Sequence, residues 1–387
     1  MDDFEDIRPY RDDEVPHVIA RLIDDVELLD FLGRYDSPRL ARVLPGLVRI
    51  LARRRVKQLL GQVTDIKSFQ QVIAYYVRKL VNETMTSFTY DGIESLSKDK
   101  SYVFVSNHRD IAGDSMLVDF ALHESGLDTA RIAVGDNLVQ RQFVTDLMKL
   151  NKSFFIKRSV SGAKKLYAAL LVSSRFVRQT LEDGQSIWIA QAEGRAKDAM
   201  DLTDVAVIKM LALAERKKPF PEVVCDLNLV PVAISYEFDP CDVSKAKELF
   251  AIAADGSYIK PPGEDLLSLA RGLGGFKGRV HVSFGKPLDG HYQTPEQVAS
   301  ELDQQILSGL KIFPINLLAL AALAEKSPYS ETWEGVRGLV EGDESAEFDL
   351  RLATCPEHLR RQWLAMYANP IVNKVTHGVM RDASLVK

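Results

Sequence analysis

The spacing of hydrophobic and polar positions changes twice along the chain. Up to about residue 85, apolar residues recur at helical intervals, as they do at Ile19, Leu22, Ile23, Val26 and Leu29. Short runs rich in β-branched and aromatic residues follow, alternating with helix-like stretches such as 161–182 and 203–216. The seven runs are SFTYDGI, YVFVS, RIAVG, SFFIK, SIWIA, LVPVAISY and RVHVSFG. After about residue 290 the helical spacing returns.

Strands that alternate with helices of this length predict an α/β fold, layered around a mostly parallel central sheet. We place this domain at residues 86–290, between an N-terminal helical region (1–85) and a C-terminal helical extension (291–387). Pro231 lies inside the sixth run, which predicts an edge strand or the start of a strand.

Composition is that of a globular protein with a sizeable core, since 46% of the 387 residues are apolar and 27% are charged. The net charge of −5 argues against a nucleic-acid partner. Cys225, Cys241 and Cys355 cannot all pair and lack metal-ligand spacing, so a reducing, cytoplasmic compartment is expected.

No segment has the features of a signal peptide or of a membrane-spanning helix. The N-terminus, MDDFEDIRPYRDDE, is acidic. The most apolar stretch, IFPINLLALAALA, has 13 residues, whereas a spanning helix needs about 20. The sequence therefore predicts a soluble protein, or one that lies on a membrane surface.

Residues 34–57 are strongly basic, with eight Lys or Arg and the single acid Asp36. An apolar stripe runs through them at Leu40, Val43, Leu44, Leu47, Ile50 and Leu51, and Pro45 should bend any helix there. In one interpretation the stripe packs on the core while the arginines face water. In the other the segment is a basic amphipathic helix that lies on anionic lipid.

Candidate catalytic residues follow the end of the second run, in SNHRDIAGDSM. A histidine at a strand end, here His108, can act as a general base if a carboxylate fixes its tautomer. Asp110 and Asp114 are both near enough in sequence to do so. A purely structural hydrogen-bonding role for the histidine is the alternative.

Two further strand ends carry basic residues. Lys157 and Arg158 precede a helix expected to start near Ser159, and cations beside a helix N-terminus suit a phosphate. The fifth run leads into Glu193, Gly194 and Arg195, where glycine allows close backbone approach and Lys197 could add to an anion pocket. The alternative for Lys157 and Arg158 is that they are solvated cations at a loop. The alternative for residues 193–195 is an ordinary exit from a strand into a turn.

One motif also suggests a hydrolase. The residues from Gly113 to Met116 resemble the serine block of GDSL-type hydrolases, with Ser115 as the nucleophile. Such an enzyme needs an Asp-x-x-His pair, and the sequence contains none. It also contains no Gly-x-Ser-x-Gly, P-loop, dinucleotide fingerprint or zinc-ligand spacing.

Taken in order, four stretches resemble the motif blocks of the glycerolipid acyltransferases, which acylate glycerol-3-phosphate and 1-acylglycerol-3-phosphate. The blocks are Asn107-His108 followed by an aspartate, Lys157-Arg158-Ser159, Glu193-Gly194-Arg195 and Val230-Pro231-Val232. The run RVHVSFGKPL resembles that family's last core strand, so the resemblance covers about residues 86–288. The family pattern of His, four residues, Asp would end on Gly113; here the spacing is one residue longer. Asp114 is the favoured partner of His108, and Asp110 is the alternative.

The resemblance implies roles for these residues. His108 would deprotonate the acceptor hydroxyl while Asp114 orients the ring. Arg158 and Arg195 would bind the acceptor phosphate, helped by Lys157 and Lys197. Glu193 would bind the glycerol portion of the acceptor or hold the pocket together, and Gly194 would leave room for the phosphate.

The resemblance also implies partners. The acyl donor would be acyl-CoA or an acyl carrier protein, with no metal or redox cofactor. Residues 34–57 would meet an anionic membrane, placing the protein in the cytoplasm or on the inner face of the cytoplasmic membrane, or would dock an acidic carrier protein. A member that acylates a non-phosphoglycerol lyso-lipid, or a catalytically silent lipid-binding member, is the alternative.

Overall fold

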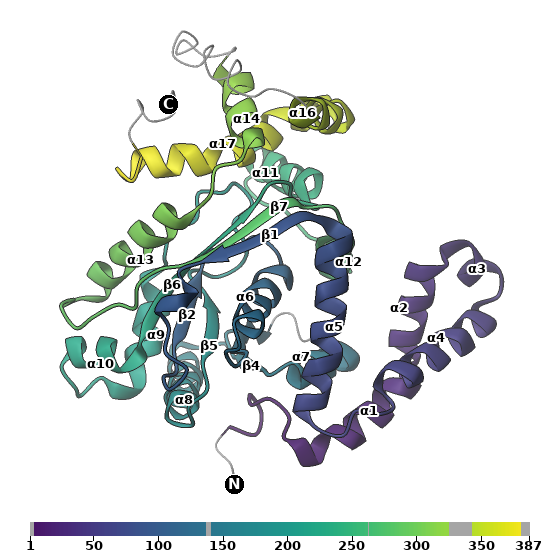
Figure 1. The fold of residues 1–387 in the computed structure, drawn as a ribbon, viewed down its shortest axis with the longest axis horizontal. Coiled ribbons are helices and arrows are strands. Elements are labelled where there is room, and N and C mark those ends of the chain that lie inside the picture. Colours follow the sequence, from purple (N-terminus) through teal and green to yellow (C-terminus); the bar gives the residue numbers. More distant parts are fainter. Residues whose placement is uncertain (1–3, 137–140, 262, 325–342, 381–387) are drawn as a thin grey trace. The chain divides into compact units, whose positions relative to one another are not determined.

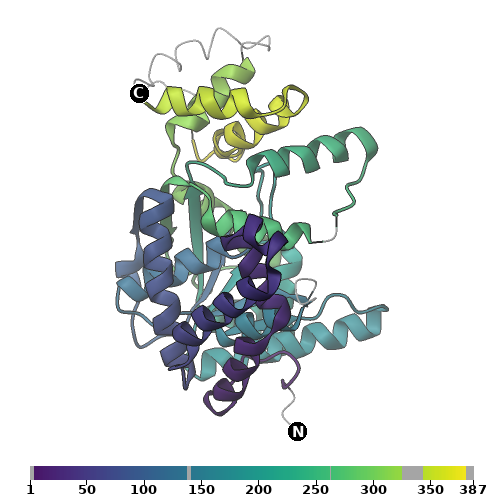
Figure 2. The same cartoon turned by 90° about the vertical axis from the view of Figure 1, so that its right-hand side faces the viewer.

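A computed structural model describes residues 4–136, 141–261, 263–324 and 343–380 (Figures 1 and 2). The chain divides into two compact units. Unit 1 contains residues 1–79 and 130–187, and unit 2 contains residues 80–129 and 188–387. The chain passes from unit 1 to unit 2, returns to unit 1 and then enters unit 2 again, so each unit contains two separate stretches of the sequence.

Unit 1 is mainly helical, with two parallel strands that pair from Ile132 with Ser153 to Gly135 with Ile156. Its elements are η1 (Asp12–Glu14), α1 (Val15–Asp24), α2 (Val26–Asp36), α3 (Pro38–Val43), α4 (Pro45–Leu60), most of α5 (Ile66–Thr84), β3 (Arg131–Gly135), α7 (Gln142–Leu150), β4 (Ser153–Ile156) and α8 (Ala163–Glu182).

A buried carboxylate joins two parts of unit 1 that are far apart in sequence. Asp146 of α7, whose side chain is 1% exposed, lies 2.7 Å from the guanidinium of Arg21 on α1. The Tyr10 hydroxyl donates to the same carboxylate at 2.8 Å. Burial alone would raise the pKa of Asp146, but the hydrogen bonds from Arg21 and Tyr10 bring it below its ordinary value.

The basic segment folds as α3 and α4, which follow α2 at the purple end of the ribbon (Figures 1 and 2). Pro45 does not bend a helix; it begins α4, where its missing N–H costs nothing. Val48 and Val56 are the buried residues of α4. The predicted stripe is exposed instead, by 38% to 74% at Leu40, Val43, Leu44, Leu47, Ile50 and Leu51. The interpretation in which this stripe packs on the core is therefore wrong.

Unit 2 carries the remaining strands and the C-terminal helices. They are β1 (Met85–Asp91), η2 (Ile93–Ser95), β2 (Val103–Ser106), α6 (Gly113–Glu124), β5 (Ile187–Ala190, whose first residue is the last of unit 1), α9 (Val205–Ala212), η4 (Leu213–Glu215), α10 (Phe220–Leu227), β6 (Leu229–Tyr236), α11 (Asp242–Asp255), α12 (Glu264–Gly274), β7 (Gly278–Phe284), α13 (Pro295–Gly309), α14 (Pro314–Ala324), α16 (Asp343–Thr354), η5 (Glu357–Leu359) and α17 (Arg360–Thr376).

All seven predicted runs form strands, and the pairing is mostly parallel, which confirms the α/β fold class. In unit 2 the neighbours run β1-β7-β6-β2-β5. The pairs β1–β7 and β2–β6 are parallel, whereas β6–β7 is antiparallel. Because β6 lies between β7 and β2, Pro231 is not on an edge strand. Pairing with β7 begins one residue later, at Val232, so the strand tolerates the proline.

The C-terminal helices α14, α16 and α17 pack with α11 around their own apolar cluster (Figure 1). Trp363 is fully buried there, and Leu318 of the apolar stretch noted above is 5% exposed. Over the described residues, no single helix has the length and apolarity to cross a bilayer; by those two criteria, the bent pair 295–309 and 314–323, which meets at 102°, could.

Candidate functional site

The side chain of Asn107, directly after β2, continues the hydrogen bonding between β2 and β6. The Asn107 side chain donates to the Ile234 carbonyl of β6 at 2.9 Å and accepts from the Ile234 N–H at 2.8 Å. The side chain is almost fully buried, so both bonds are shielded from water. This pairing positions the next residue, His108, where the strand turns away.

His108 and Asp114 form a hydrogen-bonded pair. His108 Nδ1 lies 2.7 Å from Asp114 Oδ2. The carboxylate is fully buried, whereas the imidazole is 16% exposed. The Trp188 ring of β5 packs edge-on against the imidazole, with 5.7 Å between ring centroids. Since a carboxylate can only accept, Nδ1 donates and Nε2 is left as the basic nitrogen.

Four donors surround the buried Asp114 carboxylate. The backbone N–H groups of Arg109 and Asp110 donate to Oδ2 at 2.6 and 2.9 Å. The Tyr236 hydroxyl donates to Oδ1 at 2.7 Å. Burial alone would raise the pKa of Asp114, but the bond from His108 and the other donors lower it, so the carboxylate is ionised.

Asp110 has a different task. Its Oδ1 accepts from the backbone N–H of Gly113 at 2.7 Å and from that of Ala112 at 3.1 Å, which closes the turn before α6. Burial, followed by the charge of Asp114, raises the pKa of Asp110 above its ordinary value. The structure therefore places Asp114, and not Asp110, against the histidine.

The loop after β5 is tied to the same strand end. The backbone N–H of Ala196 donates to the His108 carbonyl at 3.0 Å, so Glu193, Gly194 and Arg195 lie on the chain directly before that contact. Gly194 has a φ of +78°, a conformation that favours glycine. Glu193 is exposed.

The basic side chains of this loop already have acidic neighbours. Arg195 is nearly buried, and its guanidinium is 3.9 Å from Asp265 of α12. Lys197 Nζ is 3.2 Å from Glu248 of α11. A bound phosphate would have to share or displace these carboxylates.

Lys157 and Arg158 belong to unit 1, where they follow β4. The helix expected near Ser159 starts later, at Ala163, so the prediction of a helix N-terminus beside them is wrong. Lys157 Nζ lies 2.8 Å from Asp6. The Asp136 carboxylate accepts from the backbone N–H groups of Arg158 and Ser159 at 3.2 Å each. These N–H groups are therefore already occupied by a carboxylate of the chain itself.

Sequence reasoning missed the residues that support the pair from outside its motif. Tyr236 ends β6, and Trp188 of β5 also donates from Nε1 to Ser106 Oγ at 3.0 Å. Both lie on strands that neighbour β2, a relation that only the sheet order reveals. Within the described ranges, no three His, Cys, Asp or Glu side chains converge as metal ligands.

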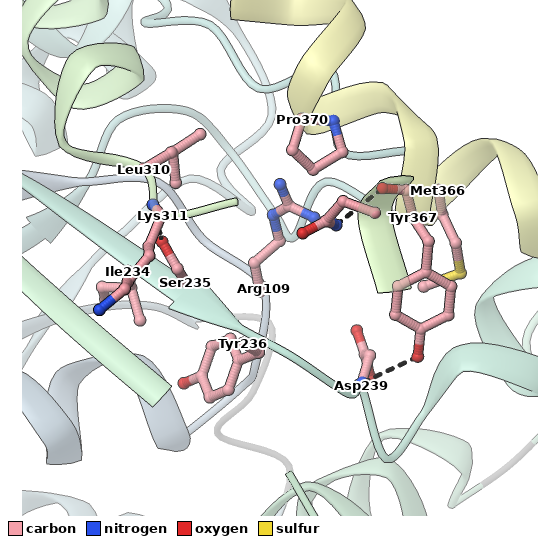
Figure 3. Close-up of a pocket in the computed structure, with 11 residues that line it drawn as sticks. Arg109, Ile234, Ser235, Tyr236, Asp239, Leu310, Lys311, Met366, Tyr367 and Pro370 are labelled. Atoms are coloured by element: carbon pink, nitrogen blue, oxygen red, sulfur yellow. Dashed lines mark hydrogen bonds between the residues drawn. The ribbon is translucent and has the colours of Figure 1, made fainter. Parts of the chain in front are cut away.

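A small cavity of about 40 Å³ opens beside Tyr236 (Figure 3). Arg109 projects from the strand end into its centre, with Asp239 and Tyr367 on one side and Lys311 on the other. The Lys245 ammonium donates to the Arg109 carbonyl at 2.7 Å and so helps to hold the turn that follows His108.

Comparisons with known proteins find similarity to acyltransferases. The family model described as Acyltransferase matches residues 87–235. The chain is 28% identical over 202 residues to the dihydroxyacetone phosphate acyltransferase of Bos taurus, covering 51% of this chain and 28% of that protein. It is 26% identical over 259 residues to the glycerol-3-phosphate acyltransferase of Xylella fastidiosa strain M12, covering 60% and 29%. The match thus spans under a third of the length of these curated relatives.

Among solved structures, the chain matches the 1-acyl-sn-glycerophosphate acyltransferase of Thermotoga maritima with 14% identity and a TM-score of 0.38. That match covers 72% of this chain and 92% of the other.

Proposed function

Because residues 87–235 form an acyltransferase domain of the glycerolipid acyltransferase superfamily, we propose that the chain is an O-acyltransferase acting on a phosphorylated glycerol-type acceptor. The observation that carries the proposal is the 2.7 Å bond between His108 Nδ1 and Asp114 Oδ2 at the end of β2. The fatty acyl group would come from an acyl thioester, either acyl-CoA or an acyl carrier protein. The reaction needs no metal or redox cofactor.

The pair would act as a general base. The acceptor hydroxyl oxygen attacks the thioester carbonyl carbon as His108 Nε2 takes the hydroxyl proton. Asp114 stabilises the resulting imidazolium without taking the proton itself. The carbon–oxygen bond forms, the carbon–sulfur bond breaks, and the imidazolium returns the proton to the departing thiolate. General-base catalysis of this kind contributes about 10² to 10⁴ in rate.

The acceptor class follows from the basic residues and from the names of the relatives. Glycerol-3-phosphate and dihydroxyacetone phosphate are both three-carbon phosphates with a primary hydroxyl; 1-acylglycerol-3-phosphate offers a secondary one. Within unit 2, Arg195 would bind the phosphate, with Lys197 as a helper. Glu193 would contact the carbon chain of the acceptor, and Gly194 would allow close approach.

The test is acyl transfer by the purified full chain. Labelled acyl-CoA or acyl carrier protein is supplied with glycerol-3-phosphate, dihydroxyacetone phosphate or lysophosphatidate. Transfer to one acceptor should be lost in His108→Ala. His123→Ala is the matched control, since His123 is exposed at the end of α6. Transfer that survives in His108→Ala contradicts the mechanism.

Two alternatives give different results in the same assay. An enzyme for a non-phosphoglycerol lyso-lipid would tolerate Arg195→Gln and would acylate none of the three phosphorylated acceptors. A silent lipid-binding member would transfer no acyl group but would still bind vesicles after His108→Ala.

The exposed stripe of α3 and α4 supports a membrane contact. Val43 is 74% exposed and Ile50 is 53% exposed. Arg49, Arg53 and Arg55 pair with carboxylates of α1 and α2, which leaves the basic residues Arg34, Arg39, Arg42, Arg54 and Lys57 for other partners. An apolar stripe flanked by cations suits an anionic lipid surface. We propose that this surface meets the inner face of the cytoplasmic membrane.

Vesicle sedimentation tests this contact. Wild type should bind vesicles that contain phosphatidylglycerol more tightly than pure phosphatidylcholine vesicles, and Val43→Asn with Ile50→Asn should weaken the binding about tenfold or more. Leu350→Asn, at a 60% exposed site on α16, is the control. If the double variant binds lipid normally but loses activity only with acyl carrier protein, the stripe docks the carrier instead.

A further inference from the structure

Tyr236 ends β6, the strand beside β2, and stands outside the motif that supplies His108 and Asp114. Its ring lines the small cavity that it shares with Arg109 and Asp239 (Figure 3). Its hydroxyl donates to Asp114 Oδ1 at 2.7 Å. A side chain from a different strand thus reaches the carboxylate that contacts the histidine.

The two oxygens of Asp114 are held by different parts of the chain. Oδ2 receives His108 Nδ1 and the backbone N–H groups of Arg109 and Asp110, all from the turn before α6. Oδ1 receives the Tyr236 hydroxyl. Asp114 is 0% exposed, so water has no access to replace a lost donor.

We propose that Tyr236 is a positioning residue for the His108–Asp114 pair. It holds Oδ1, so that Oδ2 faces the imidazole and keeps the proton on Nδ1, which leaves Nε2 as the base. This role rests on the proposed function for its effect on acyl transfer, but the effect on the histidine tautomer depends on geometry alone.

Replacing Tyr236 with phenylalanine removes one hydroxyl and alters none of the charged side chains around the His108–Asp114 pair. Burial raises the pKa of Tyr236 well above its ordinary value, and the charges of Asp114, Asp110 and Asp239 add to this effect. Lys245 and Lys277 lie near Asp110 and Asp239. Arg109 is paired with Asp201 at 3.0 Å. Because Tyr236→Phe keeps the ring and all these charges, it isolates the hydroxyl.

The decisive measurement is the tautomer of His108 by ¹⁵N NMR of histidine-labelled protein, with His108→Ala used to assign the resonance. Neutral His108 in the wild type should carry its proton on Nδ1. In Tyr236→Phe the share of the Nε2–H form should rise several-fold, while thermal unfolding confirms that the variant is folded. Tyr258→Phe is the matched control, because it removes another tyrosine–carboxylate bond, to Glu264, elsewhere in unit 2.

Acyl transfer is measured in parallel. Tyr236→Phe should lower kcat about tenfold with the acceptor KM unchanged. An unchanged tautomer in Tyr236→Phe overturns the inference, whatever the activity. If no acceptor is acylated by the wild type but the tautomer shifts, the proposed function fails and the positioning role stands.

Discussion

Gly113 packs so closely on Asp110 that a side chain at position 113 would stand 2.9 Å from Asp110 Oδ1. Gly272 of α12 presses on the same carboxylate from another direction, where a Cβ would also clash. Position 113 is where the family pattern would put its aspartate. A side chain at this position would crowd the Asp110 carboxylate, and the next residue, Asp114, provides the carboxylate that contacts His108.

Gly113→Ala tests this packing. The added methyl group would push the buried Asp110 carboxylate from its turn, and overpacking of this kind costs about 1–3 kcal/mol. The free energy of unfolding of Gly113→Ala, measured by urea titration, should be lower than that of the wild type by this amount.

Gly46→Ala in α4 is the control, since a Cβ there meets nothing within 4 Å. Equal stability of the two variants would contradict the clash.

Separate substitutions of the two aspartates distinguish their tasks. Asp114→Asn should lower kcat by about 10² to 10⁴, because an amide cannot stabilise the imidazolium and favours the wrong tautomer. Asp110→Asn retains an oxygen that can accept from Gly113 and should keep kcat within about threefold. Steady-state kinetics of both variants with one acceptor decides the matter. A larger kcat loss in Asp110→Asn would reverse the assignment.

The strand pattern predicted more of the fold than of the site. Continuous apolar runs such as LVPVAISY are buried on both faces, and such runs can be recognised as strands from the sequence alone. The division into two units could not be predicted, because it depends on contacts between segments far apart in the chain. The sequence also could not predict that Leu47 and the rest of the apolar stripe at 40–51 are exposed, because an amphipathic pattern does not show whether another part of the protein covers its apolar face.

At the site, sequence reasoning identified His108 and left its partner open between two aspartates. The choice depends on the turn, where Asp110 accepts backbone N–H groups and only Asp114 reaches the ring. The role of Tyr236 could not be predicted from the sequence, because this residue and Asp114 are 122 positions apart. Such contacts follow from the strand order and not from local spacing.

The Lys197–Glu248 ion pair, at 3.2 Å, should regulate acceptor affinity. If Lys197 helps to bind the acceptor phosphate, Glu248→Gln removes a competing anion and lowers the acceptor KM about threefold, with kcat unchanged. Lys197→Gln should raise the KM. Glu222→Gln on α10 is exposed and serves as the control. A higher KM in Glu248→Gln would mean that the glutamate positions the lysine for binding.

Lys374 gives the C-terminal helices a measurable pH dependence. Its ammonium, on α17, donates to the Leu310 carbonyl at 2.6 Å, and burial lowers its pKa from 10.5 to about 8. Between these two values the unfolded chain holds a proton on this lysine that the folded chain has lost. The free energy of unfolding should therefore rise with pH across that window, by roughly 3 kcal/mol. Urea titrations at several pH values should show this rise as a difference between the wild type and Lys374→Met. Lys247→Met, at an exposed site on α11, should follow the wild type. If Lys374→Met also follows the wild type, Lys374 retains an ordinary pKa in the folded protein.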